Sequence, residues 1–234
     1  MNEVKTNFKF ERDAAISKLT NGFIVHTCDS LGAVGLLKND VLKVDVVQSV
    51  LYSLRVALME NISIGGKILS VSLAFANSPD YAERGMKAAF EFLKKWKVSV
   101  VISTEKNFPT SQTGIGVSVV GFTKKLRIGG ATSNVGVYTL GTPAVGKEVM
   151  NSSVLTIDEF KRLLKFKSVG EVIPVGSKGI MAEARILAKN SGLTFHPLLD
   201  ESWMTKSAGP ATCIVFWATR PPRLSNVKKV GWLE

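Results

Sequence analysis

Cysteine and histidine are scarce in this sequence, with two of each among 234 residues. The sequence holds no C-x-x-C, H-E-x-x-H or G-x-S-x-G motif and no Cys/His pairing, so zinc sites and the common hydrolase nucleophiles lack support. Cys28 and Cys213 both stand among apolar or small residues in strand-like segments, and we expect both to be buried, reduced thiols. His26, inside an expected strand, is interpreted as a structural residue and not as a catalytic base.

Long apolar runs are also missing from the sequence. None reaches the roughly 18 residues that a membrane span needs, and the opening string MNEVKTNFKFERD lacks the apolar core of a secretory signal. The composition is 45% hydrophobic and 21% charged, with 20 glycines, which is typical of an ordinary globular protein. We therefore expect a folded cytoplasmic protein without a membrane partner.

Acidic residues are outnumbered by basic ones, which gives a formal net charge of +11. Clustered lysine and arginine can bind nucleic acid, so the positions of the clusters indicate whether nucleic acid is an expected partner. The densest groups lie at an expected helix end, in an expected linker and in a third segment: Lys94, Lys95 and Lys97; Lys124, Lys125 and Arg127; and 161–167. The helix dipole explains the first group, and an anionic small substrate or nucleotide explains the others about as well as nucleic acid does.

Hydrophobic patterning predicts a β-α-β-α-β-β order for the first half of the chain. The apolar segment 22–28 is predicted to be a buried strand that ends in a polar loop carrying Asp29. Apolar positions recur at helical spacing from Val46 to Ile64, and Ser78-Pro79-Asp80 opens a second helix that runs to about Trp96. The remaining predicted strands are 68–76, 98–103 and 115–120.

A glycine-containing, basic stretch at 122–131 is the predicted domain boundary, which divides the chain into domains 1–123 and 124–234. The second domain is predicted to hold two helices, one at 157–166 capped by Thr156 or Asp158 and one at 180–190. Its predicted strands are 135–141, a β-like run before Gly176, and a final strand at 213–218 that leads into Pro221-Pro222. Alternating strands and helices predict a layered α/β or α+β fold.

Four acidic residues stand where strand ends and the first long helix could bring them together: Asp29, Asp45, Glu60 and Glu105. Magnesium takes oxygen ligands and keeps waters and substrate phosphates in its shell, so carboxylates of this kind suit it. Spacing alone does not show that the four converge. The alternative interpretation is that Asp45 caps the first helix and that Glu60 is solvated.

The string PVGSKG ends a β-like run and opens a helix. Backbone N–H groups at such a point bind anions, so Gly176, Ser177, Lys178 and Gly179 are candidate phosphate-binding residues. The Walker A spacing is absent, and an isolated loop of this composition is more often a plain turn.

Several strings together resemble one family. They are TCDSLGAVG, KNDVLKVD, RVALMENISIGGK, STEKNFPTSQTGIGVSVVG, VIPVGSKGIMAEA and KSAGPATC, of which NFPTSQTG and SAGPATC are the most specific. They resemble the α-ribazole kinases and related selenophosphate synthetase-like proteins of the aminoimidazole ribonucleotide synthetase (PurM-like) superfamily, over about residues 22–218.

The resemblance implies a two-domain PurM-like fold, with an N-terminal sheet-and-helix domain that forms a homodimer and a C-terminal α/β domain that closes over an ATP cleft. It implies Mg²⁺ ligands at Asp29, Asp45, Glu60 and Glu105, with Asp29 and Glu105 catalytic. The neighbouring polar residues Thr104, Asn107, Thr110 and Gln112 would then contact the nucleotide. The implied reaction is ATP-dependent phosphorylation of a nucleoside-like small molecule, with the 5′-hydroxyl of α-ribazole, from salvage of the cobamide lower ligand, as the expected acceptor.

Some residues depart from the family pattern. Ile102 replaces a usual glycine, Lys106 stands where a second Glu is common, and the N-terminus lacks the glycine-rich GDDAA string that holds ATP phosphates in thiamine-monophosphate kinase. Two alternatives therefore stay open. One is another reaction of the superfamily, of the thiamine-monophosphate kinase, selenophosphate synthetase or aminoimidazole ribonucleotide synthetase kind. The other is a non-catalytic protein that binds nucleotide or nucleic acid, although nucleic acid is the less expected partner.

Overall fold

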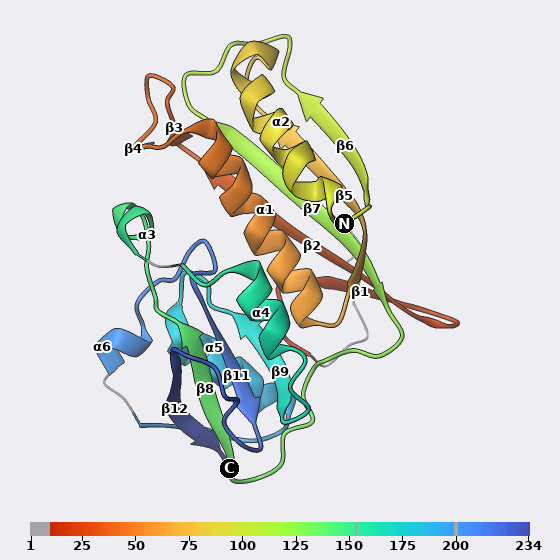
Figure 1. Cartoon of the computed structure of the whole chain (residues 1–234), viewed down its shortest axis with the longest axis vertical. Coiled ribbons are helices and arrows are strands. Elements are labelled where there is room, and N and C mark those ends of the chain that lie inside the picture. The colour runs from red at the N-terminus through yellow and green to blue at the C-terminus, as the bar shows by residue number, and fades with distance from the viewer. Residues whose placement is uncertain (1–9, 153, 199–200) are drawn as a thin grey trace, which may run out of the picture.

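The computed structural model describes residues 10–152, 154–198 and 201–234. Residues 1–9, part of the string interpreted above as lacking a secretory signal, lie outside this description. The described chain folds around two five-stranded sheets, one built from each half (Figure 1). No helix in the described part of the chain is both long and apolar enough to cross a membrane.

The first sheet has the strand order β1-β2-β7-β5-β6, with β5 and β6 parallel and the other neighbours antiparallel. Helices α1 and α2 cover one face of it, where alternate apolar residues of the strands form a core with them. A small pair of strands, β3 and β4, precedes α1. The elements of this half are β1 (Ala15–Leu19), β2 (Gly22–Gly32), β3 (Val34–Gly35), β4 (Leu42–Lys43), α1 (Val46–Ser63), β5 (Lys67–Phe75), α2 (Pro79–Lys94), β6 (Ser99–Thr104) and β7 (Gly114–Thr123).

The second sheet has the order β10-β12-β8-β11-β9, and its paired strands are antiparallel. Helix α5 packs on one face of it, and α4 packs on the other. The elements of this half are β8 (Val135–Gly141), α3 (Lys147–Asn151), α4 (Ile157–Leu163), β9 (Val169–Pro174), α5 (Gly179–Asn190), β10 (Phe195–Pro197), α6 (Glu201–Met204), β11 (Cys213–Ala218) and β12 (Val227–Leu233).

Helix α1 joins the two halves. Its apolar residues Val50, Leu54 and Leu58 pack under the first sheet, whereas Met59 belongs to the core between α4 and the second sheet. Figure 1 shows α1 running along the first sheet with its C-terminal end beside α4 and β9. A helix that serves two cores fixes how the halves face each other, and so it shapes the space between them.

The long predicted elements are found at nearly the predicted residues, but two predictions about strand ends are wrong. The first strand does not end at Cys28, because β2 continues to Gly32 and Asp29 pairs with Val117 inside the ladder. The strand at 213–218 is also not the final one, since the connection that contains Pro221 and Pro222 leads to a further strand, β12. The strand β12 pairs with β8 and β10 and so completes the second sheet.

Two smaller predictions are settled by local structure. Thr156, and not Asp158, caps α4, through a capping box with Glu159. Cys213 is buried as expected, but Cys28 is exposed, because its position in β2 points it to the face that α1 and α2 leave uncovered. The first sheet ends at Thr123 and the second begins at Val135, while the domain boundary at 123/124 stays a prediction.

Candidate functional site

A cavity of about 750 Å³ lies between the two halves of the chain. Its walls come from the end of β2, from α1, from the segment around α3, from the end of β9 and from residues 209–211. Ligand sites occur preferentially at such junctions, where several elements each contribute a few polar groups to a partly apolar hollow. The polar and loop residues that line this cleft include Asp13, Asp29, Ser53, Glu60, Gly176 and Ser177.

Asp29 enters the cleft from β2. Its position in the ladder turns its side chain toward α1, where it lies near the buried Ser53 hydroxyl. Burial raises the pKa of Asp29, and the nearby Ser53 hydroxyl and Ser30 backbone oppose that rise. The structure therefore puts this predicted site residue on the cleft wall, held from the side by α1.

Glu60 enters the cleft from the C-terminal part of α1 and is buried, so the interpretation of this residue as solvated is wrong. Arg12 Nη2 lies 3.4 Å from its carboxylate, and Arg12 Nη1 lies 3.2 Å from Glu171 on β9. Burial raises the pKa of Glu60 to about 8, because one guanidinium shared by two carboxylates offsets only part of the desolvation. We refer to Arg12, Glu60 and Glu171 as the arginine clasp.

Two further carboxylates near the clasp were missed from the sequence. Asp13 lines the cleft beside Glu60, and Glu183 on α5 accepts a hydrogen bond from the Gly176 backbone. Burial and the charge of Asp13 raise the pKa of Glu183 to about 7. The signal for Asp13 was present, since Asp13-Ala14-Ala15 keeps the last three letters of the GDDAA string that was judged absent. No sequence pattern pointed to Glu183.

Asp45 has a different setting. Its carboxylate accepts a hydrogen bond from the Val47 backbone at 2.9 Å, which caps α1, and pairs with Arg84 at 2.8 Å. Asp45 does not line the cleft. The structure thus gives it the capping role that was the alternative interpretation, and its role as a metal ligand stays a prediction.

Glu105 follows β6 in an exposed loop. Its carboxylate accepts hydrogen bonds from the backbone of Asn107 at 2.5 Å and of Phe108 at 3.3 Å, and these lower its pKa. With Thr104 it lines a second hollow of about 580 Å³, which shares Ser30 and Leu31 with the cleft. Asp29 and Glu105 therefore lie in adjoining hollows and not in one.

The remaining predicted nucleotide contacts fall into two groups. Thr110 and Gln112 hold their own loop, by hydrogen bonds to the carbonyls of Ala76 at 2.6 Å and Asn39 at 2.8 Å, and they do not line the cleft. Gly176 and Ser177 do line it, directly before α5. Lys178 is the residue that precedes α5, and Gly179 begins the helix.

Gly179 has a φ of +78°, which L side chains rarely adopt. An added Cβ would also lie 2.7 Å from the Met204 carbonyl oxygen. The turn into α5 is therefore tight, and the Gly179 N–H donates to the Gly176 carbonyl within it at 3.3 Å.

The donor set suits a magnesium nucleotide in part. Asp13 and Asp29 offer carboxylate oxygens without an ion-pair partner among the described residues, and oxygen is what Mg²⁺ prefers. Glu60 is already bound by Arg12, and Asp45 by Arg84. No group of three His, Cys, Asp or Glu residues that could hold a metal occurs in the part of the chain that the structure describes.

Neither protein-family models nor curated protein sequences match this chain. Solved structures do match. A thiamine monophosphate kinase from Aquifex aeolicus is 17% identical, with a TM-score of 0.65 over 95% of this chain and 88% of that one. A structure of AaThiL complexed with AMPPCP and TMP is 18% identical, with a TM-score of 0.66 over 95% and 84%.

A third match extends the likeness to another kind of protein. The HypE-HypF complex contains a chain that is 15% identical, with a TM-score of 0.62 over 95% of this chain and 87% of that one. At these identities the likeness concerns the fold, and it covers both sheets and the cleft between them. The described chain has the PurM-like fold.

Proposed function

We propose that this chain is an ATP-dependent kinase of a small molecule, with its active site in the cleft. One observation carries the proposal: the cleft brings Asp29 from the first sheet to Gly176 and Ser177 from the second half. Carboxylates opposite an anion-binding loop are what a magnesium-bound polyphosphate needs. A likeness in fold to AaThiL, which was solved with AMPPCP and TMP, supports the nucleotide.

In this proposal the chain positions the reactants. The backbone around Gly176 and Ser177 would bind phosphate oxygens, while Asp29 and Asp13 would hold Mg²⁺. Magnesium would supply neutralisation of the charge on the phosphates. The apolar wall of Val34, Leu42 and Val44 excludes water from the reacting groups. Phosphoryl transfer of this kind depends mainly on positioning and electrostatics.

The acceptor is the least supported part of the proposal. The sequence resemblance favours the 5′-hydroxyl of α-ribazole, whereas the structural neighbours with kinase names act on thiamine monophosphate. The test is ADP release from Mg-ATP by the purified chain with each compound and with a panel of nucleosides. Turnover with one acceptor that collapses in Asp29→Asn and persists in Lys18→Gln, an exposed control, would support the kinase and name its substrate class.

One observation favours a second candidate function. Arg12 and Arg84 already neutralise two of the four predicted metal ligands, Glu60 and Asp45, and Lys106 puts a further cation beside Glu105. A chain of this kind could bind nucleotide without turning it over. Magnesium-dependent binding of AMPPCP with no ADP release on any acceptor would favour this function, and absence of nucleotide binding would exclude both.

We also infer a homodimer that forms through the uncovered face of the first sheet. The strands β6 and β7 contain no charged residue, and exposed side chains on this sheet include Leu69 and Val101. An uncharged, partly apolar sheet face is typical of a surface that packs against another sheet. Light scattering after gel filtration tests this, and Val101→Glu should give monomers where Lys18→Glu should not.

A further inference from the structure

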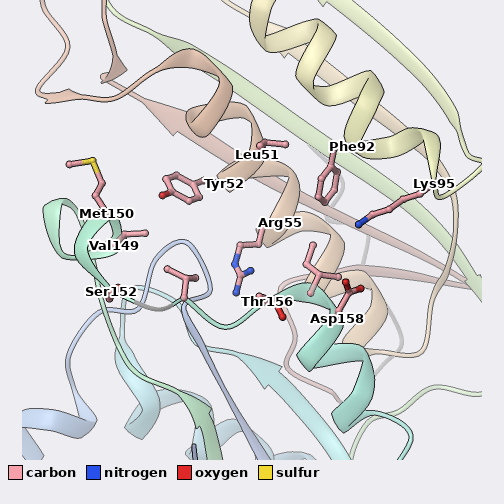
Figure 2. A pocket seen from close by; sticks show the side chains of 12 residues that line it. Leu51, Tyr52, Arg55, Phe92, Lys95, Val149, Met150, Ser152, Thr156 and Asp158 are labelled. Carbon is pink, nitrogen blue, oxygen red and sulfur yellow. The ribbon is translucent and has the colours of Figure 1, made fainter. Parts of the chain in front are cut away.

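A second cavity, of about 440 Å³, lies on the other side of α1 from the core of the first sheet. Figure 2 shows its walls: Tyr52 and Arg55 from α1, Phe92 and Lys95 from the end of α2, and Met150 from α3. Both halves of the chain contribute to it, as they do to the cleft. We refer to this cavity as the Arg55 pocket.

Arg55 is the unusual group in the Arg55 pocket, since it is only 8% exposed and carries a charge. Its Nε donates to the Pro210 carbonyl at 3.0 Å and its Nη2 to the Ala211 carbonyl at 2.9 Å. No carboxylate of the described residues forms an ion pair with it. Burial lowers the pKa of Arg55 to about 10, which measures the cost of holding this charge away from water.

The third nitrogen of the guanidinium, Nη1, has no hydrogen-bond partner in the described part of the chain. The mostly buried guanidinium leaves three N–H bonds without a partner in the described residues, two on Nη1 and one on Nη2, and an anion in the pocket would lower the cost of its burial. Guanidinium groups bind phosphate and carboxylate strongly in such settings, because the hydrogen bonds are charge-assisted. The Arg55 pocket therefore offers an anion free guanidinium N–H groups, and the Glu159 carboxylate acts on Arg55 only from beyond ion-pair distance.

The other charges around the Arg55 pocket leave it favourable to an anion. Lys95 lines the opposite wall, as Figure 2 shows, and Lys161 lies over the Trp96 ring close by. Asp158 also lines the wall, and it interacts with Lys161. The Glu159 carboxylate is engaged in the cap of α4, where it accepts from the Thr156 backbone and hydroxyl at 2.7 and 2.8 Å.

The remaining lining is partly apolar and aromatic, with Leu51, Phe92 and Met150, and partly polar, with Ser152 and Thr156. We propose that the Arg55 pocket binds a small molecule that has one anionic group and one flat apolar ring. The anionic group lies on Arg55 Nη1 and the Lys95 ammonium, and the ring lies on the apolar wall. This site is separate from the cleft, and the inference does not depend on the proposed kinase activity.

The Arg55 pocket and the cleft are nevertheless neighbours. Tyr52, Val149 and Met150 line both, and the two residues whose carbonyls bind Arg55 also line the cleft. Because the cavities share these residues, we expect a ligand in one cavity to shift groups in the wall of the other. Each ligand should therefore change the affinity for the other, and linkage requires the two changes to be equal.

The experiment uses the full chain and phenyl phosphate, which combines an anion with a ring. Inorganic phosphate and benzyl alcohol serve as half-probes, and isothermal titration calorimetry gives each affinity. We expect phenyl phosphate to bind more tightly than either half-probe. Binding should persist with saturating Mg-AMPPCP, so that failure of the nucleotide site and failure of this pocket are distinguishable.

Two adjacent lysines provide a matched pair of variants. Lys95→Glu reverses a charge in the wall, whereas Lys94→Glu reverses one at the same helix end outside it. We expect Lys95→Glu to weaken phenyl phosphate binding about tenfold and Lys94→Glu to weaken it less than about twofold. Arg55→Gln should abolish binding, and its melting curve shows whether the fold is kept.

Three results would overturn the proposal. If phenyl phosphate binds no more tightly than inorganic phosphate, the pocket does not bind the ring. Equal losses in the Lys94 and Lys95 variants would mean a general charge effect and not a site. Displacement of phenyl phosphate by Mg-AMPPCP, one for one, would place it in the cleft.

Discussion

The two ends of α1 carry acidic residues that sequence reasoning treated alike, and the structure treats them differently. Asp45 stands before the first turn, half-exposed, where it caps the helix and pairs with an exposed arginine. Glu60 stands in the last turns, buried at the junction of the two halves, where it shares Arg12 with Glu171. The role of a carboxylate is set by what the rest of the fold brings to it, which the local sequence does not contain.

Environment also sets the sign of the pKa shift for each acid. Burial raises the pKa of Asp29, Glu60 and Glu183, of which the first two line the cleft between the halves. Backbone hydrogen bonds lower the pKa of Glu105, which lies half-exposed in an outer loop. The predicted acids therefore fall into two groups. Asp29 and Glu60 lie in the cleft between the halves, whereas Glu105 lies in an outer loop and Asp45 at the start of α1.

Removal of Arg12 should have the largest effect, because it leaves two buried carboxylates without their cation. We expect Arg12→Met to lower the free energy of unfolding at neutral pH by about 3–5 kcal/mol. Urea denaturation measures this. Lys189→Ala, which breaks the exposed pair with Glu11, should cost only about 0–1 kcal/mol. Equal losses in the two variants would mean that the clasp does not hold the halves together.

Glu60→Gln tests the junction through pH. The pKa of Glu60 is raised from 4.5 to about 8 in the fold, so its stabilising contribution is full below pH 4.5 and is lost as pH rises toward 8. The glutamine stays neutral, so the unfolding free energy of the variant should fall less steeply between pH 4.5 and 8 than that of the wild type. The two slopes should differ by at most about 1.4 kcal/mol per pH unit. Denaturation at several pH values checks this. Glu83→Gln, at an exposed site, should keep the wild-type slope.

Asp45→Ala tests the other end of the helix. Loss of the cap should cost about 0.5–2 kcal/mol of unfolding free energy, and Asp45→Asn should recover most of it because asparagine caps equally well. Chemical denaturation gives both values. We expect AMPPCP affinity to change little in either variant. A loss of magnesium-dependent binding in both, with stability kept in Asp45→Asn, would instead support the predicted metal role.

The long elements were predictable because local periodicity and caps determine them. Helix α1 and helix α2 follow apolar spacing and a Ser-Pro start, and their predicted ends differ from the structure by one or two residues. The strands β1 and β12 were missed, since β1 is a short edge strand with mostly exposed residues and β12 follows a proline pair that marks a turn. β1 is a strand because it pairs with β2, and β12 is a strand because it pairs with β8. Their own sequences do not predict this.

The cleft was predictable only in part, for the same reason. Asp29, Gly176 and Ser177 each carried a local signal, either a strand end or a strand-to-helix loop. In the structure all three line the cleft. Glu183 lies on the inner side of an ordinary helix, and the buried Arg12 comes from a segment without regular structure. Arg12 matters because it contacts Glu171, which lies 159 residues further along the sequence. No local sequence pattern reports such a contact.

The smallest effect on stability is expected at Glu105, where the comparison is sharpest. Its carboxylate is exposed and accepts only backbone hydrogen bonds, and the glutamine of Glu105→Gln keeps an acceptor oxygen for them. The melting temperature should therefore not move, while ADP release should fall at least about tenfold, as loss of a charge that contacts magnesium or phosphate predicts. Glu83→Gln supplies the control for an exposed acid far from the cleft. Unchanged turnover in Glu105→Gln would mean that Glu105 does not take part in the reaction. The acids of the cleft, such as Asp29, would then carry it, and the outer loop would serve only to shape the adjoining hollow.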